Sequence, residues 1–177
     1  MLGRLEDCIF EGLPNALAME WPVRFTIALR DSSADEEALR RACMRFLHTT
    51  VSRSLERYAD AETRAACQPA LDVVAASAKG QPISAEKAAA DSVRAATAVA
   101  ERKAASRQWA LALAARAAAK AAAEAMAPAP AALAAMAAMA AAKAAEAAMA
   151  EKARDAAKEA AYTEMADTLI AEIEAAS

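Results

Sequence analysis

The sequence predicts an all-α fold: a helical bundle with a long antiparallel alanine-rich helical hairpin, built as a single all-α domain over residues 1–177. Sixty of the 177 residues are alanine, and 29 of them lie between residues 101 and 150. Alanine has the highest helix propensity because its side chain loses no rotamer entropy on folding. Prolines interrupt the alanine-rich tract once, at 127–131, and proline breaks a helix interior. Residues 81–177 are therefore expected to form the hairpin, and residues 1–80 a set of irregular and amphipathic helices.

Two short helices are expected in the first thirty residues. Four apolar residues at helical spacing predict the first, which Gly12 and Pro14 should end: Leu2, Leu5, Ile9 and Leu13. Apolar residues then alternate strictly over 21–29, which by period is a strand signal. Because a lone strand would find no partner elsewhere in this chain, a short helix starting at Pro22 is favoured instead.

The next two helices have stronger signals. Ser33 and Glu36 match a capping box in front of a long amphipathic helix. Its apolar stripe consists of Leu39, Cys43, Phe46, Leu47, Val51 (or Thr50), Leu55 and Tyr58. Asp60 can cap a further helix over 61–79, in which Pro69 is expected to start a fresh turn or a kink. Gly80 and Pro82 should stop that helix.

The hairpin itself is expected to consist of two rods. The first covers about 85–127, with Ser84 as the N-cap and a break near Ser106 as an alternative, and the second covers about 131–175. At 1.5 Å per residue, each unbroken rod would be about 65 Å long. Alanine faces let the two axes approach closely, but each methyl group buries little apolar area. Larger side chains must complete the core: Val93, Val99, Trp109, Leu111, Leu113, Leu133, Met136, Met139, Met149, Tyr162, Met165, Leu169 and Ile173. The N-terminal helices should cover the alanine surface of the hairpin.

Charge and cysteine content limit the classes of function and the location. The net charge is −3, with both signs spread along the chain, so neither nucleic-acid binding nor attraction to an anionic membrane is expected. Residues 125–142 carry no charge over a length that could span a bilayer. Because they are mostly alanine and contain two prolines, a membrane span is not expected. Three widely spaced cysteines and the lack of an apolar leader favour the reducing cytoplasm.

The residues that could carry catalysis or metal binding do not form a convincing site. His48 and Ser52 share a helix face, but no glycine-rich elbow is present to orient them. The three cysteines (Cys8, Cys43, Cys67) lack the spacing of metal ligands and are expected to be small buried hydrophobic residues. The chain has only three glycines, which argues against a P-loop or a dinucleotide fingerprint. We therefore expect no enzyme activity, no cofactor and no metal.

Arginines concentrate in the N-terminal half of the chain, and some of them share helix faces. These arginines are Arg40, Arg41, Arg45, Arg53, Arg57 and Arg64. They could form a basic face for phosphate groups, but nearby acids make surface ion pairs the favoured explanation.

The order of elements over about 40–177 resembles a group of alanine-rich immunity proteins of bacterial polymorphic-toxin loci and related alanine-rich phage proteins. The resembling stretches are Arg40-Arg41-Ala42-Cys43, Pro69-Ala70-Leu71-Asp72 before Gly80, Ser84 before the alanine tract, and Glu164-Met165-Ala166-Asp167-Thr168-Leu169. The resemblance implies a protein that binds and neutralises another protein and catalyses no reaction of its own. It supplies no catalytic residues.

The leading hypothesis is therefore a non-catalytic inhibitor, either an immunity protein that neutralises a toxin or a phage protein that blocks a host defence complex. Aromatic and arginine residues typical of binding hot spots concentrate in the N-terminal region. The predicted partner-binding residues are Trp21, Arg24, Phe25, Arg41 and Arg45. A structural protein that self-assembles through its alanine face into a homo-oligomer is the alternative. A small-molecule binder or enzyme is a third class, and it would require a polar pocket between helices.

Overall fold

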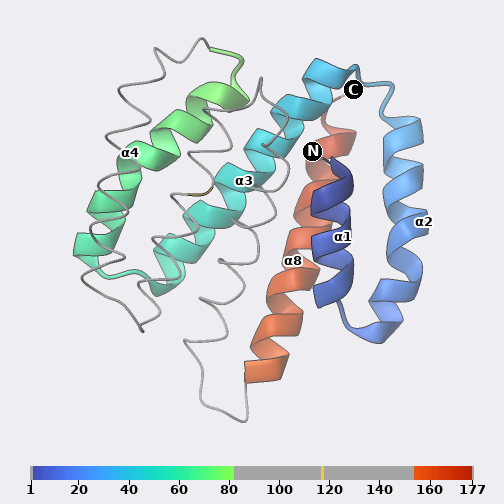
Figure 1. The fold of residues 1–177 in the computed structure, drawn as a ribbon, viewed down its shortest axis with the longest axis horizontal. Coiled ribbons are helices and arrows are strands. Elements are labelled where there is room, and N and C mark those ends of the chain that lie inside the picture. Colours follow the sequence, from blue (N-terminus) through green and yellow to red (C-terminus); the bar gives the residue numbers. More distant parts are fainter. Residues whose placement is uncertain (1, 82–116, 118–153, 177) are drawn as a thin grey trace.

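The computed structural model describes residues 2–81, 117 and 154–176, and these residues confirm the all-α class (Figure 1). Five helices are defined within this part of the chain: α1 (Leu2–Gly12), α2 (Asn15–Asp31), α3 (Glu36–Tyr58), α4 (Ala61–Ala78) and α8 (Arg154–Glu174). The first alanine-rich rod, its Ser84 cap, the turn at Pro128–Pro130 and residues 131–153 of the second rod lie outside the described residues, except that Ala117 is helical and buried.

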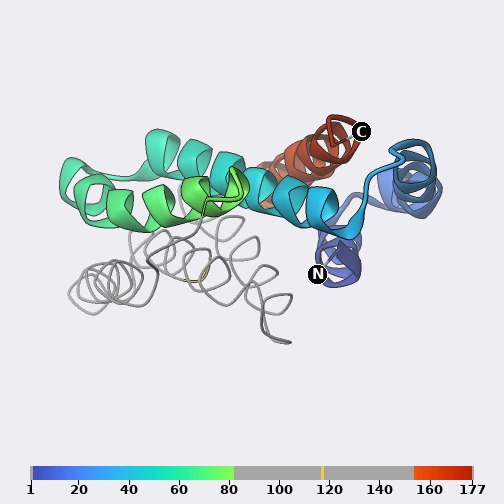
Figure 2. The same ribbon diagram turned by 90° about the horizontal axis from the view of Figure 1, so that it is seen from above.

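Helix α8 brings the end of the chain between two N-terminal helix pairs. It packs against α1 and α2 on one side and against α3 on the other, while α4 packs against α3. Figures 1 and 2 show this arrangement, with α3 and α4 side by side at one end and α1 and α2 at the other. The N-terminal helices α1, α2 and α3 therefore pack around the C-terminal helix, whereas most of the alanine surface that they were predicted to cover lies outside the described residues.

Helix α1 has the predicted extent, whereas α2 is longer than predicted. Its first residue is Asn15, so the prediction of a helix is confirmed and the predicted start at Pro22 is wrong. Pro14 stands at the N-cap, and its fixed φ suits a helix start, so the chain turns directly from α1 into α2. Pro22 lies inside the helix on its exposed side, where water can reach the backbone groups that the ring leaves unpaired.

Helix α3 begins one residue after an aspartate cap. The Asp35 carboxylate accepts a hydrogen bond of 2.7 Å from the backbone N–H of Ala38. Ser33 instead adopts a left-handed conformation with φ of 46°, so the predicted capping box of Ser33 and Glu36 is wrong. The apolar stripe is confirmed. Its buried members are Cys43, Phe46, Leu47, Thr50, Val51 and Leu55, while Leu39 and Tyr58 are half-buried.

Helix α4 has both predicted ends. The Asp60 carboxylate accepts a hydrogen bond from the N–H of Thr63 at 2.8 Å. The helix runs through Pro69, so no fresh turn starts there. At its end, the N–H of Gln81 bonds to the carbonyl of Ala76 and that of Gly80 bonds to the carbonyl of Ser77, both at 3.0 Å. Gly80 has φ of +67°, so glycine allows this Schellman motif without a steric penalty.

The core runs along α8 and joins both helix pairs. Four of the large residues predicted to complete the hairpin core are buried in α8: Tyr162, Met165, Leu169 and Ile173. Trp21 and Phe46 are the largest fully buried side chains from the N-terminal half. No helix in the described ranges combines the length and apolar content needed to cross a membrane, and residues 125–142 lie outside those ranges.

Candidate functional site

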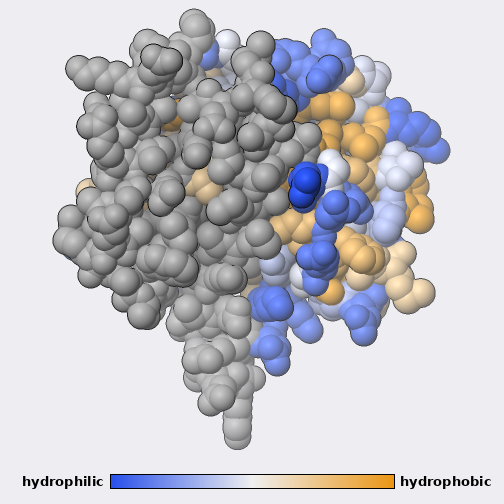
Figure 3. All heavy atoms as spheres, in the orientation of Figure 1, coloured by the Kyte–Doolittle hydropathy of each residue, from blue (hydrophilic) through white to orange (hydrophobic). Residues whose placement is uncertain are grey.

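Large apolar side chains are left exposed at one place in the described part of the chain, on α1 and α2. Phe10 is 44% exposed, and the α2 residues Met19, Val23 and Ile27 are 83%, 61% and 44% exposed. Residues four apart lie on one helix face, so Met19, Val23 and Ile27 form a line, here called the α2 stripe. Figure 3 shows apolar residues gathered over α1 and α2, with hydrophilic side chains among them.

Helix α2 therefore has two apolar faces. Trp21, Phe25 and Ala28 form the buried face, which packs into the core of the protein. The α2 stripe lies on another side of the same helix and faces solvent. A surface helix normally keeps its solvent face polar, and a clustered exposed apolar surface marks an interaction site more often than isolated apolar residues do.

Three polar side chains of α2 near the α2 stripe already have partners within the chain. Arg24 bonds to Asp167 of α8 at 2.9 Å, and Arg30 bonds to the adjacent Asp31 at 2.7 Å. The Thr26 hydroxyl donates to the carbonyl of Pro22 at 2.7 Å. A partner covering the stripe would thus have few unpaired polar groups to satisfy.

Two of the five predicted partner-binding residues are core residues. Trp21 is 1% exposed and Phe25 is 8% exposed, and their rings pack tilted with centroids 5.6 Å apart. The Trp21 indole N–H has no hydrogen-bond partner in the described part of the protein. Neither ring is presented at the surface, so the placement of these two residues on a partner surface is corrected.

The three predicted arginines are in ion pairs and do not form one surface. Arg24 is at the edge of the α2 stripe. Arg41 pairs with Glu37 one turn earlier, at 3.3 Å. Arg45 bonds to the Glu172 carboxylate at 2.6 Å and to its backbone carbonyl at 3.2 Å, so it fastens α3 to α8. The α2 stripe is not among the predicted binding residues, although Met19, Val23 and Ile27 have helical spacing.

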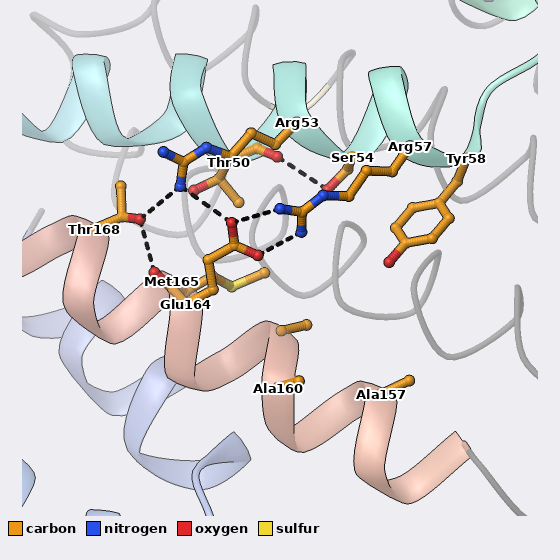
Figure 4. A pocket seen from close by; sticks show the side chains of 11 residues that line it. Thr50, Arg53, Ser54, Arg57, Tyr58, Ala157, Ala160, Glu164, Met165 and Thr168 are labelled. Carbon is orange, nitrogen blue, oxygen red and sulfur yellow. Dashed lines mark hydrogen bonds and ion pairs between the residues drawn. The ribbon is translucent and has the colours of Figure 1, made fainter.

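A second feature is a cleft of about 210 Å³ between α3 and α8. Its lining residues are Thr50, Arg53, Ser54, Arg57, Tyr58, Ala157, Ala160, Ala161, Glu164, Met165 and Thr168. Figure 4 shows the α3 side chains facing the alanines of α8 across the opening. Because methyl groups reach only a short way, the alanines leave space where larger residues would fill the gap.

Glu164 forms the centre of the charged side of this cleft. Arg57 approaches it with both terminal nitrogens, at 2.6 and 3.0 Å, and Arg53 donates to it at 3.2 Å (Figure 4). The same Arg53 nitrogen also donates to the Thr168 hydroxyl at 3.3 Å. The hydrogen bonds from Arg57 and the positive charges of both guanidiniums lower the pKa of the Glu164 carboxyl.

The lowered pKa of Glu164 predicts a loss of stability in acid. The ionised form is the one that Arg53 and Arg57 stabilise, so its contribution is present above the ordinary carboxyl value and is lost as pH falls through the lowered pKa. We expect Glu164→Gln to be less stable than wild type at pH 7 and to approach it by pH 3. Urea midpoints at both pH values measure this. Exposed Glu159→Gln on the same helix is the control, and an equal gap at both pH values would refute the prediction.

The three cysteines are buried and form no disulfide. Burial raises the pKa of Cys8 and of Cys67 to about 11 and that of Cys43 to about 12, because a thiolate is poorly solvated in the core. They are thus small core residues, as predicted. In the described residues no group of three or more potential metal ligands converges, and His48 is half-buried on α3.

Alkylation by iodoacetamide tests this assignment. At pH 8 a pKa of about 11 leaves about a hundredfold less thiolate than the ordinary value of 9.0 does. We expect the native protein to react with iodoacetamide at least that much more slowly than the urea-unfolded protein, with three labels gained per unfolded chain, measured by intact mass. Rapid labelling of the native protein would show that a thiol is accessible and activated.

Comparisons of the sequence and of the fold with known proteins found no match. No protein-family model matches the sequence, no curated protein matches it, and no solved structure matches its fold. The class that the structure defines is an all-α helical bundle in which a C-terminal helix joins two N-terminal helix pairs. Its resemblance to alanine-rich immunity proteins stays a prediction.

Proposed function

We propose that this chain is a non-catalytic protein that binds another protein through the α2 stripe and inhibits it. The observation that carries the proposal is the exposure of Met19, Val23 and Ile27 in line on a helix that also has a fully buried face. Leaving three large side chains in water gains nothing for folding, whereas covering them releases the water around them.

The chemistry of the stripe favours an apolar groove as the partner surface. Anchors at positions i, i+4 and i+8 match a helix that lies in a hydrophobic groove. Helix α2 carries two acidic and two basic residues, Glu20, Asp31, Arg24 and Arg30, so it is neutral. A neutral, apolar strip complements a neutral, apolar groove better than a strongly charged surface such as nucleic acid. The proposed partner is therefore a toxin or a host defence component with such a groove, and the proposed place of action is the cytoplasm.

Inhibition of an isolated partner tests the proposal. Wild-type protein and the Met19→Glu/Val23→Glu variant would each be immobilised and exposed to the products of neighbouring genes and to extracts of the source cells. A protein retained by wild type alone would be purified and its own activity assayed with increasing amounts of the chain. We expect that activity to fall to its minimum at one chain per partner. Full activity in the presence of excess chain, or equal retention by the variant, would contradict the proposal.

A homo-oligomer is the competing occupant of the same surface. If the stripe is kept for a different protein, sedimentation of the purified chain should give the monomer mass of 18.4 kDa at every concentration. A dimer that grows with concentration and disappears in Met19→Glu/Val23→Glu would place a second copy on the stripe and overturn the proposal.

A further inference from the structure

The cleft between α3 and α8 combines an apolar bed with an excess of positive charge. Ala157, Ala160 and Ala161 form the bed, and Met165 lies beside Glu164 (Figure 4). Two guanidiniums face one carboxylate, so the charged side carries one positive charge in excess. An apolar bed beside a positive edge is suited to a ligand that has an apolar body and a negative end.

The two arginines have different roles in this cleft. Arg57 donates hydrogen bonds from both terminal nitrogens to the Glu164 carboxylate and so holds that carboxylate in place. Arg53 uses a single nitrogen, Nη1, for both Glu164 and Thr168, and its Nε and Nη2 have no partner among the described residues. The Arg53 side chain is 47% exposed, so water solvates these N–H groups and a ligand carboxylate can replace that water.

Two of the hydroxyl groups in the cleft already donate within the protein. Ser54 donates to the carbonyl of Thr50 at 2.9 Å, and Thr168 donates to the carbonyl of Glu164 at 2.7 Å. Of the two arginines, Arg53 is therefore the cation with N–H groups open to a negative end among the described residues. Glu164 also limits the charge of the ligand, because a second negative charge would be repelled by its carboxylate.

We infer that this cleft binds a small amphipathic monoanion, with one carboxylate on Arg53 and an apolar or aromatic body against the alanines of α8. The volume of about 210 Å³ is below the 300 Å³ at which drug-sized pockets begin, so the body is one ring or a short chain. This inference does not rest on the proposed protein-binding function, which involves the α2 stripe.

Three probes with the same benzyl body separate charge from shape: phenylacetate (negative), 2-phenylethanol (neutral) and 2-phenylethylammonium (positive). Binding to the full chain would be measured by NMR from the methyl signal of Met165. We expect phenylacetate to bind about tenfold more tightly than 2-phenylethanol, since charged hydrogen bonds to arginine are the stronger kind, and the ammonium to bind most weakly. Equal binding of the three probes, or no shift with any of them at 10 mM, would overturn the inference.

Two variants assign the binding to the cleft. Arg53→Gln should weaken phenylacetate binding about tenfold and leave 2-phenylethanol binding unchanged, because it removes the cation alone. Ala160→Leu adds a side chain at an exposed position of the bed and should abolish binding of every probe. Exposed Arg64→Gln on α4 is the charge-matched control and should bind as wild type does. An unchanged phenylacetate affinity in Arg53→Gln would mean that the probe binds elsewhere on the protein, and this result would contradict the inference.

Discussion

Trp21→Ala is expected to lower the free energy of unfolding by about 3–5 kcal/mol, the range for removing a large aromatic side chain from a core. Trp21 is 1% exposed and packs against Phe25, so truncation leaves a cavity between α2 and the rest of the core. The unpaired indole N–H places the effect toward the lower end, because its loss removes a polar group that is buried without a partner. Urea unfolding followed by circular dichroism measures the change.

Met19→Ala is the matched control for this substitution. Met19 lies two residues earlier on the same helix and is 83% exposed, so its truncation should change stability by less than about 0.5 kcal/mol. The pair separates the two faces of α2. If Trp21→Ala were as stable as Met19→Ala, the tryptophan would not be a core residue and its predicted place on the partner surface would be reinstated.

Gly12→Ala should be the second strongly destabilising change, by about 3 kcal/mol. A Cβ atom at Gly12 would overlap the ring of Tyr162. Tyr162 lies on α8 and is 7% exposed, so it belongs to the core of the protein. The ring cannot move out of the way without opening the contact between α1 and α8, and overpacking of this kind usually lowers stability by about 1–3 kcal/mol. Thermal unfolding should show a Tm lower by about 6–12 °C for a chain of this length.

Gly3→Ala tests whether the effect comes from this contact. No atom lies within 4 Å of a Cβ atom placed at Gly3, and alanine favours a helix over glycine by about 1 kcal/mol. We therefore expect Gly3→Ala to be as stable as wild type or slightly more stable. A similar loss in both variants would mean that glycine is needed at helix α1 in general, and the close approach of Tyr162 would not explain Gly12.

Local signals predicted most of the described helices correctly. Apolar spacing located α1 and α3, and Asp60 and Gly80 marked the two ends of α4 because caps act within a few residues. The capping-box pattern predicted Ser33 as the cap of α3, but Asp35 also has a capping side chain, and only the backbone conformation separates the two residues. The predicted start of α2 at Pro22 is wrong because the residues before it, such as Ala16, Leu17 and Ala18, are good helix formers, and a proline on the exposed side does not stop the helix.

The candidate sites depend on contacts that local patterns do not reveal. Arg45 pairs with Glu172, and Arg57 with Glu164, across more than a hundred residues of chain. Periodicity shows that such arginines share a face but not which acid meets them. Likewise, apolar residues at 21, 23, 25 and 27 look equivalent in the sequence. The packing of α8 against α2 decides that Trp21 and Phe25 are buried and that Val23 and Ile27 are exposed.

The affinity of the isolated partner for stripe variants tests the central claim most directly. Met19→Glu/Val23→Glu places two charges on the α2 stripe, and Ala61→Glu/Ala65→Glu places the same pair at the same spacing on the exposed side of α4. We predict that the stripe variant binds at least about a hundredfold more weakly by calorimetry, because buried unpaired charges oppose association, while the α4 variant binds as wild type does. Unchanged affinity of the stripe variant, with both variants folded by circular dichroism, would contradict the account.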